Sequence, residues 1–326
     1  MGRMSTALIA GGMLAACLWP AAAFADWDPT KPLELVVHGA PGSGPDTFGR
    51  AIANALEKEN LLPVRIQINN KSGGSGSTAM SYVVQNKGNN DMLAVFTMLW
   101  LSNPLVIAES DVTIDQMTPV ARLVLEPALI VTRADAPYET LADFIEAAKA
   151  SPGQLKQSGG SITARDNIMR QILMAKTGSD WTFISFPGGG ERLAALLGGH
   201  VDLLMMEPQE VGEQVRAGKV RILAQISENR LEEYPDVPTI QEAGFDVPNV
   251  PQGRGIVAAP EMSQEAVDYY VDVFARMSKS PTWQEFLERN QIINAFAGPA
   301  DTKAFFEDFV AEMRTVLTAA GVPLVR

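Results

Sequence analysis

The hydrophobic residues of this chain alternate between short apolar runs and segments in which they recur every three or four positions. The run 33–37 is typical of a buried strand, and the next segment places Phe48, Ile52 and Leu56 on one helical face. Further strands are expected at 64–68, 92–97, 120–125, 128–132, 154–157, 181–185, 201–205, 220–224 and 256–259, and helices at 141–150, 165–176, 191–197, briefly around 239–242, and through the C-terminal part. This alternation predicts an α/β fold built on mostly parallel sheets flanked by helices.

The length of the chain predicts two lobes. A chain of about 300 residues exceeds the size at which one hydrophobic core usually stops growing. Glu126-Pro127 separates two extended segments, and the chain is expected to cross between lobes there and again near 250–253. We therefore predict a first lobe of residues 26–127 and 252–326 and a second lobe of residues 128–251.

Glycine-rich turns follow several of the expected strands. They lie at 38–47, 70–77, 158–161 and 187–190. A turn that opens into a helix directs unpaired backbone N–H groups at one point, where the positive end of the helix dipole also lies. A single turn of this kind is explained as well by ordinary loop chemistry. Repetition at the carboxyl ends of strands favours a cleft that holds a small carboxylate.

The first residues have the pattern of a secretory signal. Arg3 is followed by an apolar run over 7–19 and by a small-residue stretch that ends at Ala25. We predict a signal peptide over residues 1–25, cleaved after Ala25. The alternative is a lipoprotein anchored at Cys17, because residues 14–17 also match a lipidation signal.

Composition excludes several kinds of chemistry. The chain has one cysteine, two histidines and a formal net charge of −12. A disulfide framework, a thiol nucleophile and a transition-metal site are therefore not expected, and neither is nucleic-acid binding. The segment 73–77 approaches a G-x-S-x-G elbow but ends in serine, and Thr47 replaces the third glycine of a dinucleotide fingerprint. We predict no catalytic residue, metal or cofactor, and the alternative is a secreted hydrolase that uses Ser75 or Ser161 with His38.

An ordered series of motifs resembles a known family along nearly the whole chain after the signal. Residues 36–46 resemble the P-G-G-x-x-D opening of the substrate-binding proteins of tripartite tricarboxylate transporters, the Bug or TctC-type receptor family. Residues 69–76 resemble its N-K-x-G-A-G-G turn, residues 186–191 its G-G-G-E, residues 197–202 its L-G-G-H-V-D and residues 235–244 its P-D-V-P-T-x-x-E-x-G. The series is far more specific than any one of its motifs.

The resemblance implies a two-lobed, type II-like periplasmic binding protein with its ligand cleft between the lobes. Such a receptor closes over a small carboxylate (a citrate-like tricarboxylate, a dicarboxylate or an aromatic acid) and delivers it to the membrane permease subunits of the transporter. It implies a monomer in the periplasm that is not an enzyme. A receptor that feeds a sensor kinase remains the alternative, because the same fold serves both roles.

Carried over by position, the resemblance also implies a set of ligand-binding residues. The first lobe contributes Ser43, Gly44, Asp46, Gly74, Ser75, Ser77 and Thr97, and the second Ser158, Ser161, Thr163, Gly188, Gly189 and Glu207. His38, Trp100 and Arg254 depart from the family pattern or resemble it only in part, and whether they touch the ligand is left open. The acidic residues at 46 and 207 add an apolar or aromatic monocarboxylate to the expected ligands.

Overall fold

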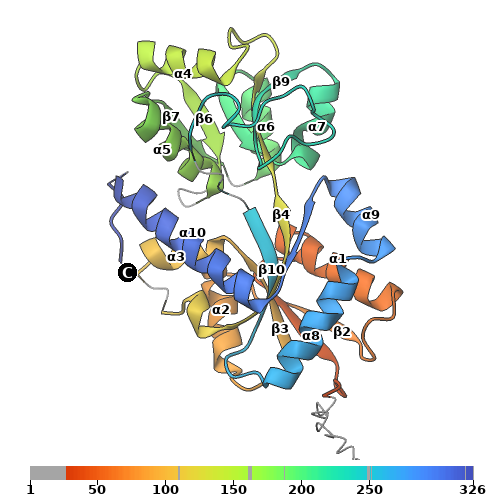
Figure 1. Ribbon diagram of the computed structural model, residues 1–326. Helices are drawn as coiled ribbons and strands as arrows, with labels where there is room; N and C mark the ends of the chain where they lie inside the picture. Colours follow the sequence, from red (N-terminus) through yellow and green to blue (C-terminus); the bar gives the residue numbers. More distant parts are fainter. Residues whose placement is uncertain are drawn as a thin grey trace, which may run out of the picture.

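Two β-sheets, each with its own helices, make up the described part of the chain. The computed structural model describes residues 27–108, 111–160, 164–186, 188–247, 250, 252–319 and 321–325. Figure 1 shows the sheets in two lobes, one above the other. The first lobe holds a six-stranded sheet in the order β11 (Ile293–Ala297), β4 (Thr118–Glu126), β10 (Gln252–Ala258), β3 (Met92–Thr97), β1 (Leu33–Val37) and β2 (Ile66–Asn70). The second holds a five-stranded sheet in the order β7 (Thr182–Ser185), β6 (Lys156–Gly159), β8 (Leu203–Met206), β5 (Ala128–Arg133) and β9 (Val220–Ile226).

The helices follow the strands of their own lobe. The first lobe carries α1 (Gly44–Lys58), α2 (Ser77–Gln85), α3 (Leu99–Val106), α8 (Gln264–Met277), α9 (Pro281–Asn290) and α10 (Pro299–Ala319), with short 3₁₀ turns at Gly74–Gly76 and Ile114–Gln116. The second carries α4 (Leu141–Ala150), α5 (Arg165–Thr177), α6 (Gly189–Leu197) and α7 (Pro208–Arg216). Among the described residues, no helix has the length and apolar character that a membrane crossing requires.

Two neighbouring strands lie where the lobes meet. β4 ends at Glu126, and β5 of the other sheet begins only two residues later at Ala128. β10 runs antiparallel to β4, with Gln252 opposite Glu126. Helix α10 also bridges the lobes, because it packs against both α3 and α5 (Figure 1). These elements connect the two lobes.

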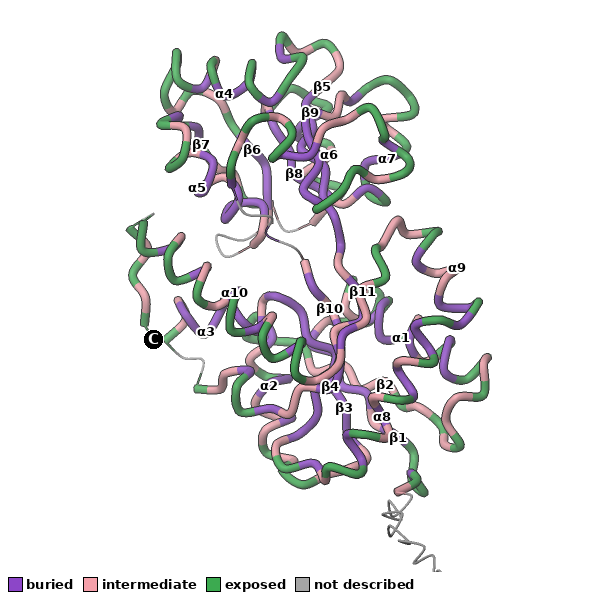
Figure 2. Tube along the Cα trace, viewed as in Figure 1, coloured by how far each residue is buried: buried purple, intermediate pink, exposed green. Residues whose placement is uncertain are grey.

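The cores lie on the faces of the sheets. Every residue of β3 is buried, as expected for a central strand covered by helices on both faces. The central strands of both sheets are buried, whereas the edge strands β2, β7 and β11 are partly exposed, and the helices alternate between buried and exposed positions (Figure 2). Trp100, Trp181 and Trp283 are the largest fully buried side chains, and one apolar cluster continues from the first lobe into the second.

The α/β fold is confirmed, but each sheet is mixed rather than mostly parallel. β1, β2 and β3 are parallel, as are β6, β7 and β8. The strands near the lobe junction, β4, β10, β5 and β9, pair antiparallel because the chain crosses between the lobes and returns beside itself. Helix α3 and strand β11 were not expected. The segment 239–242 forms turns, and Thr239 makes an isolated bridge to Gln225.

Candidate functional site

The first glycine-rich turn is held in shape by a buried carboxylate. Asp46 is only 1% exposed, and its Oδ2 accepts hydrogen bonds from Gly42 N at 2.8 Å and from Arg50 Nε at 2.9 Å. Its Oδ1 accepts from Asn70 Nδ2 at 2.9 Å, and the same amide donates to Gly39 O. Arg50 and the other donors lower the pKa of Asp46 to about 2. Asp46 therefore fixes the turn and ties it to the end of β2.

The second turn has an unusual backbone. Four consecutive residues have positive φ: Gly73 at 125°, Gly74 at 54°, Ser75 at 52° and Gly76 at 100°. Only glycine adopts such angles without strain, so Ser75 is held there by its surroundings. Asn103 Nδ2 donates to Ser75 O at 2.8 Å and supplies part of that support. Concave runs of this kind present successive N–H groups to an anion.

A buried histidine and tryptophan lie behind these turns. Thr97 Oγ1 and His38 Nε2 are 3.3 Å apart, and the rings of His38 and Trp100 are 5.6 Å apart. His38 Nδ1 and Trp100 Nε1 are buried with no hydrogen-bond partner among the described residues. Burial, followed by the positive charge of Arg254, lowers the pKa of His38 to about 4. The imidazole is therefore neutral near pH 7.

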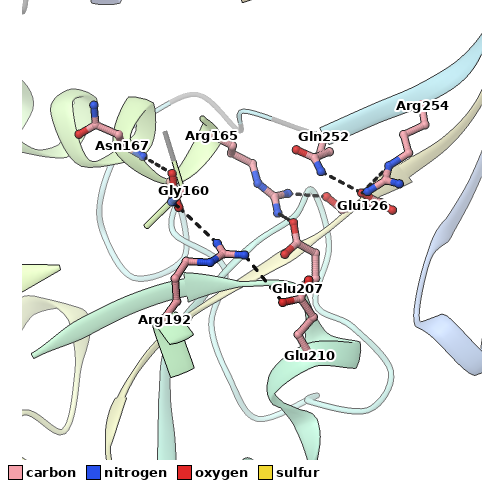
Figure 3. Close-up of polar contacts among 10 residues, drawn as sticks. Glu126, Gly160, Arg165, Asn167, Arg192, Glu207, Glu210, Gln252 and Arg254 are labelled. Carbon is pink, nitrogen blue, oxygen red and sulfur yellow. Dashed lines mark hydrogen bonds and ion pairs between the residues drawn. The ribbon is translucent and has the colours of Figure 1, made fainter. Parts of the chain in front are cut away.

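An ion pair joins the strands at the lobe junction. Arg254 on β10 places Nη2 at 2.8 Å and Nε at 3.0 Å from Glu126 Oε2, and Gln252 Nε2 donates to the same oxygen at 3.1 Å (Figure 3). Arg254 Nη1 and Nη2 lie 3.4 Å and 3.6 Å from the position that a Cβ would take on Gly44. The guanidinium therefore lies beside the first residue of α1, where the helix dipole is also positive.

A second arginine is paired with a carboxylate in the wall of the other lobe. Arg165, the first residue of α5, places Nη2 at 2.6 Å from Glu207 Oε1, while Nη1 donates to Glu126 O at 2.6 Å (Figure 3). The side chains of Arg165 and Glu207 are 9% and 13% exposed. Strand β6 lies between β7 and β8, so the start of α5 reaches the end of β8 where Glu207 stands.

A third arginine is held more loosely. Arg192 Nη1 lies 3.4 Å from Asp166 Oδ2, and Nη2 lies 3.8 Å from Glu210 Oε2. Asp166 also accepts hydrogen bonds from Gly160 N at 2.7 Å and Asn167 N at 2.8 Å. Burial raises the pKa of Asp166, and burial followed by the nearby Glu207 raises the pKa of Glu210. This end of the site is thus crowded with carboxylates.

A cavity of about 470 Å³ lies between these features. His38 and Thr97 line it from the first lobe, Arg254 and Gln252 from the junction, and Arg165 and Glu207 from the second lobe. Its remaining lining is largely apolar and includes Met98, Leu99, Ile168, Phe186, Met205 and Phe309. The size matches pockets that take a small organic ligand.

The structure distributes the predicted site residues unevenly around this cavity. Thr97 and Glu207 line it directly. Ser158 is buried and its hydroxyl lies 3.3 Å from Arg192 O, where it supports α6. Ser161 and Thr163 lie outside the described residues. The other predicted residues stand on the turns and helix starts and are not among the described residues that line the cavity: Ser43, Gly44, Asp46, Gly74, Ser75, Ser77, Gly188 and Gly189.

Sequence reasoning missed the charged network. Arg165, Arg192 and Glu126 were not among the predicted site residues, although all three belong to the network that surrounds the cavity. Their positions in the sequence could have indicated a role in the site, because Arg165 is the first residue of a helix and Glu126 lies where the chain crosses between the lobes. The described residues include no group of three or more side chains suited to hold a metal ion.

Comparison with known proteins fits this geometry. A model of the tripartite tricarboxylate transporter family receptor matches residues 49–322. Protein BugT of Bordetella pertussis is 26% identical over 321 residues, which cover 92% of each chain. A TctC solute binding protein from Polaromonas, solved without ligand, is 28% identical with a TM-score of 0.78 over 89% of this chain and 99% of its own.

A second solved structure has the same fold at lower identity. It is an R. palustris protein with adipate, 24% identical with a TM-score of 0.78 over 90% of this chain and 98% of its own. The resemblance inferred from the sequence motifs is thereby confirmed. Since the family model matches residues 49–322, most of the chain, the chain belongs to the family of tripartite tricarboxylate transporter receptors.

Proposed function

We propose that this protein is a periplasmic receptor that captures a small carboxylate between its lobes and delivers it to the permease of a tripartite tricarboxylate transporter. The observation that carries the proposal is the 470 Å³ cavity, which lies between two lobes that are joined by adjacent strands. A ligand that contacts both walls binds the closed arrangement more tightly than the open one, and this difference drives closure. The relative solved with adipate supports a carboxylate as the ligand.

Delivery, rather than conversion, is the proposed outcome of binding. A serine hydrolase would need a histidine that activates the serine, and His38 instead faces Thr97 at 3.3 Å. We expect the bound acid to be recovered chemically unchanged after prolonged incubation, as read by NMR. Turnover of the acid would contradict the receptor function.

The cavity itself can be tested by filling it. Leu99 is half-buried and lines the cavity, whereas Leu197 lies on the exposed side of α6. Thermal-shift titration with mono-, di- and tricarboxylates should find at least one acid that raises the Tm, because a ligand specific for the folded state stabilises it by mass action. Leu99→Trp should abolish that shift, and Leu197→Trp should retain it. Equal shifts in both variants would place the ligand elsewhere.

Localisation belongs to the same proposal. The predicted cleavage after Ala25 and the alternative lipid anchor at Cys17 both lie outside the described residues. We expect the protein in the periplasmic fraction as a monomer whose N-terminal residue is Asp26. Mass spectrometry of the exported chain and size-exclusion chromatography measure both properties. A mature chain that begins with acylated Cys17 would establish the anchored form.

A further inference from the structure

Each arginine that lines the described part of the cavity already faces a carboxylate of the chain itself. Arg254 pairs with Glu126, Arg165 with Glu207, and Arg192 with Asp166 and Glu210. A ligand with several carboxylates would need cations or backbone N–H groups that are free to receive them. Among the arginines of the described lining, Arg254 is the one that also lies beside a helix start of the first lobe.

The end of the cavity at Arg254 lies at the first lobe. Arg254 directs Nε and Nη2 to the carboxylate of Glu126, while Nη1 lies beside Gly44 at the start of α1. His38 lines the same region and is neutral near pH 7, so it adds no second positive charge. Nη1 of Arg254 and the start of α1 together suit one carboxylate.

In the described part of the opposite wall, Arg165 is already paired with a carboxylate. Glu207 Oε1 lies 2.6 Å from Arg165 Nη2, and Arg165 Nη1 donates a hydrogen bond to the carbonyl of Glu126. Glu207 thus occupies the position beside Arg165 that the second carboxylate of a ligand would need. To displace it, that carboxylate would have to leave Glu207 in a largely buried position without its partner.

Neighbouring charges make such a displacement more costly. Asp166 and Glu210 flank Arg192 nearby, and Glu207 already raises the pKa of Glu210. A further negative group on this wall would be repelled by all three carboxylates. The surfaces between the two ends are apolar, with Met98, Leu99, Phe186, Met205 and Phe309 among them.

We propose that this receptor selects acids with a single carboxylate and an apolar body, and that Glu207 is the specificity-determining residue that rejects a second carboxylate. The inference rests on the proposed function and narrows its ligand class. The ligand carboxylate binds between Arg254 and the turns of the first lobe, and its apolar body lies along the hydrophobic lining.

Matched pairs of acids test the selectivity of the wild-type protein. Straight-chain monocarboxylates from butanoate to octanoate are compared by calorimetry with the dicarboxylates of the same lengths, and benzoate with benzene-1,4-dicarboxylate. We expect the best monocarboxylate to bind at least about tenfold more tightly than its dicarboxylate partner. Equal or tighter binding of the dicarboxylates would overturn this inference and leave the receptor function standing. Binding of neither series would contradict the receptor function as well.

Removal of the built-in carboxylate provides the second test. Glu207→Gln keeps the size of the side chain and frees the charge of Arg165, so the affinity for the dicarboxylates should rise about tenfold or more relative to their monocarboxylate partners. Glu213→Gln on the exposed side of α7 removes the same charge outside the cavity and is the matched control. An unchanged ratio in Glu207→Gln, or the same rise in Glu213→Gln, would show that Glu207 does not set the selectivity.

Discussion

Arg254 and Glu126 lie on adjacent antiparallel strands where the lobes meet, with Arg254 Nη2 2.8 Å from Glu126 Oε2. The carbonyl of the same Glu126 accepts from Arg165 of the second lobe. One residue of β4 thus contacts both an arginine that faces the first lobe and an arginine that belongs to the second. Glu126 therefore both stabilises the junction between the lobes and positions two arginines that line the cavity.

Glu126→Gln should therefore destabilise the protein. The carboxylate is 3% exposed, and its loss leaves the guanidinium of Arg254 largely buried without a counter-charge. Removing one partner of a buried ion pair costs about 3–5 kcal/mol, and the retained amide oxygen offsets part of that loss. Urea denaturation should show a free energy of unfolding lower by about 3 kcal/mol.

A surface pair supplies the control for this prediction. Glu285 lies 2.6 Å from Arg289 on α9, and both side chains are exposed. Glu285→Gln should change the free energy of unfolding by less than about 1 kcal/mol. Similar losses in the two variants would show that burial adds nothing to the Glu126 pair.

His38 should make the stability of the protein depend on pH. Its pKa is about 4 in the folded protein against 6.5 in a model peptide. Above pH 6.5 the ring is neutral in both states and contributes no dependence. As the pH falls from 6.5 to 4, the unfolded chain binds a proton that the folded protein does not, so the folded state loses stability. The total loss is about 3 kcal/mol.

The variant His38→Gln isolates this effect. Glutamine retains a polar group opposite Thr97 and does not titrate. We expect the difference in free energy of unfolding between wild type and variant to be constant above pH 7 and to shift against the wild type by about 3 kcal/mol at pH 4. A difference that stays constant over the whole range would show that His38 is protonated equally in both states.

Local sequence patterns predicted the framework of the fold because each pattern reports on its own segment. β1, the glycine turn and α1 follow from an apolar run, a turn signal and a helical period. Helix α3 was not predicted because Trp100 to Leu105 are all buried, so the segment lacks the exposed polar face of an amphipathic helix, and Pro104 interrupts it. Strand β11 was not predicted because it begins with two exposed residues and has only one buried residue, so its sequence shows little alternation between apolar and polar positions.

The site was harder to predict because its chemistry depends on contacts between distant segments. Glu207 was predicted as a ligand-binding residue, and its ion pair with Arg165 joins positions 42 residues apart. That contact exists because β6 and β8 are neighbours in the sheet, and no local pattern reports sheet order. The glycine-rich turns could be predicted from their glycines. The carboxylates that pair with each arginine could not be predicted from any local pattern.

Gly76→Ala should be more harmful than an ordinary glycine substitution. Gly76 has φ of 100°, and a Cβ there would lie 2.9 Å from Trp100 Nε1. Gly88 has φ of 75° with open space around it, so Gly88→Ala reports the backbone cost alone. Thermal denaturation should show a loss of about 1 kcal/mol for Gly88→Ala and about 2–4 kcal/mol for Gly76→Ala. Equal losses would mean that Trp100 moves aside without cost.

Asp46→Asn should loosen the first turn and lower the free energy of unfolding at pH 7. The carboxylate accepts hydrogen bonds from Gly42, Arg50 and Asn70, and each hydrogen bond to a charged group contributes about 1.5–3 kcal/mol. The pKa of Asp46 is lowered to about 2, so its stabilising effect is complete above the unfolded value near 4 and is lost as the pH falls toward 2. The penalty of the variant should shrink over that window.

Asp272→Asn is the matched control for the turn, because Asp272 pairs with Arg276 on the exposed side of α8. It should cost less than about 1 kcal/mol. Acid-dependent urea denaturation of the two variants measures both predictions, and calorimetry with the best monocarboxylate measures the consequence for binding. Because Asp46 fixes the turn that leads into Gly44, beside Arg254 Nη1, Asp46→Asn should weaken ligand binding about tenfold while Asp272→Asn leaves it unchanged. Full affinity in Asp46→Asn would mean that the ligand carboxylate does not depend on this turn.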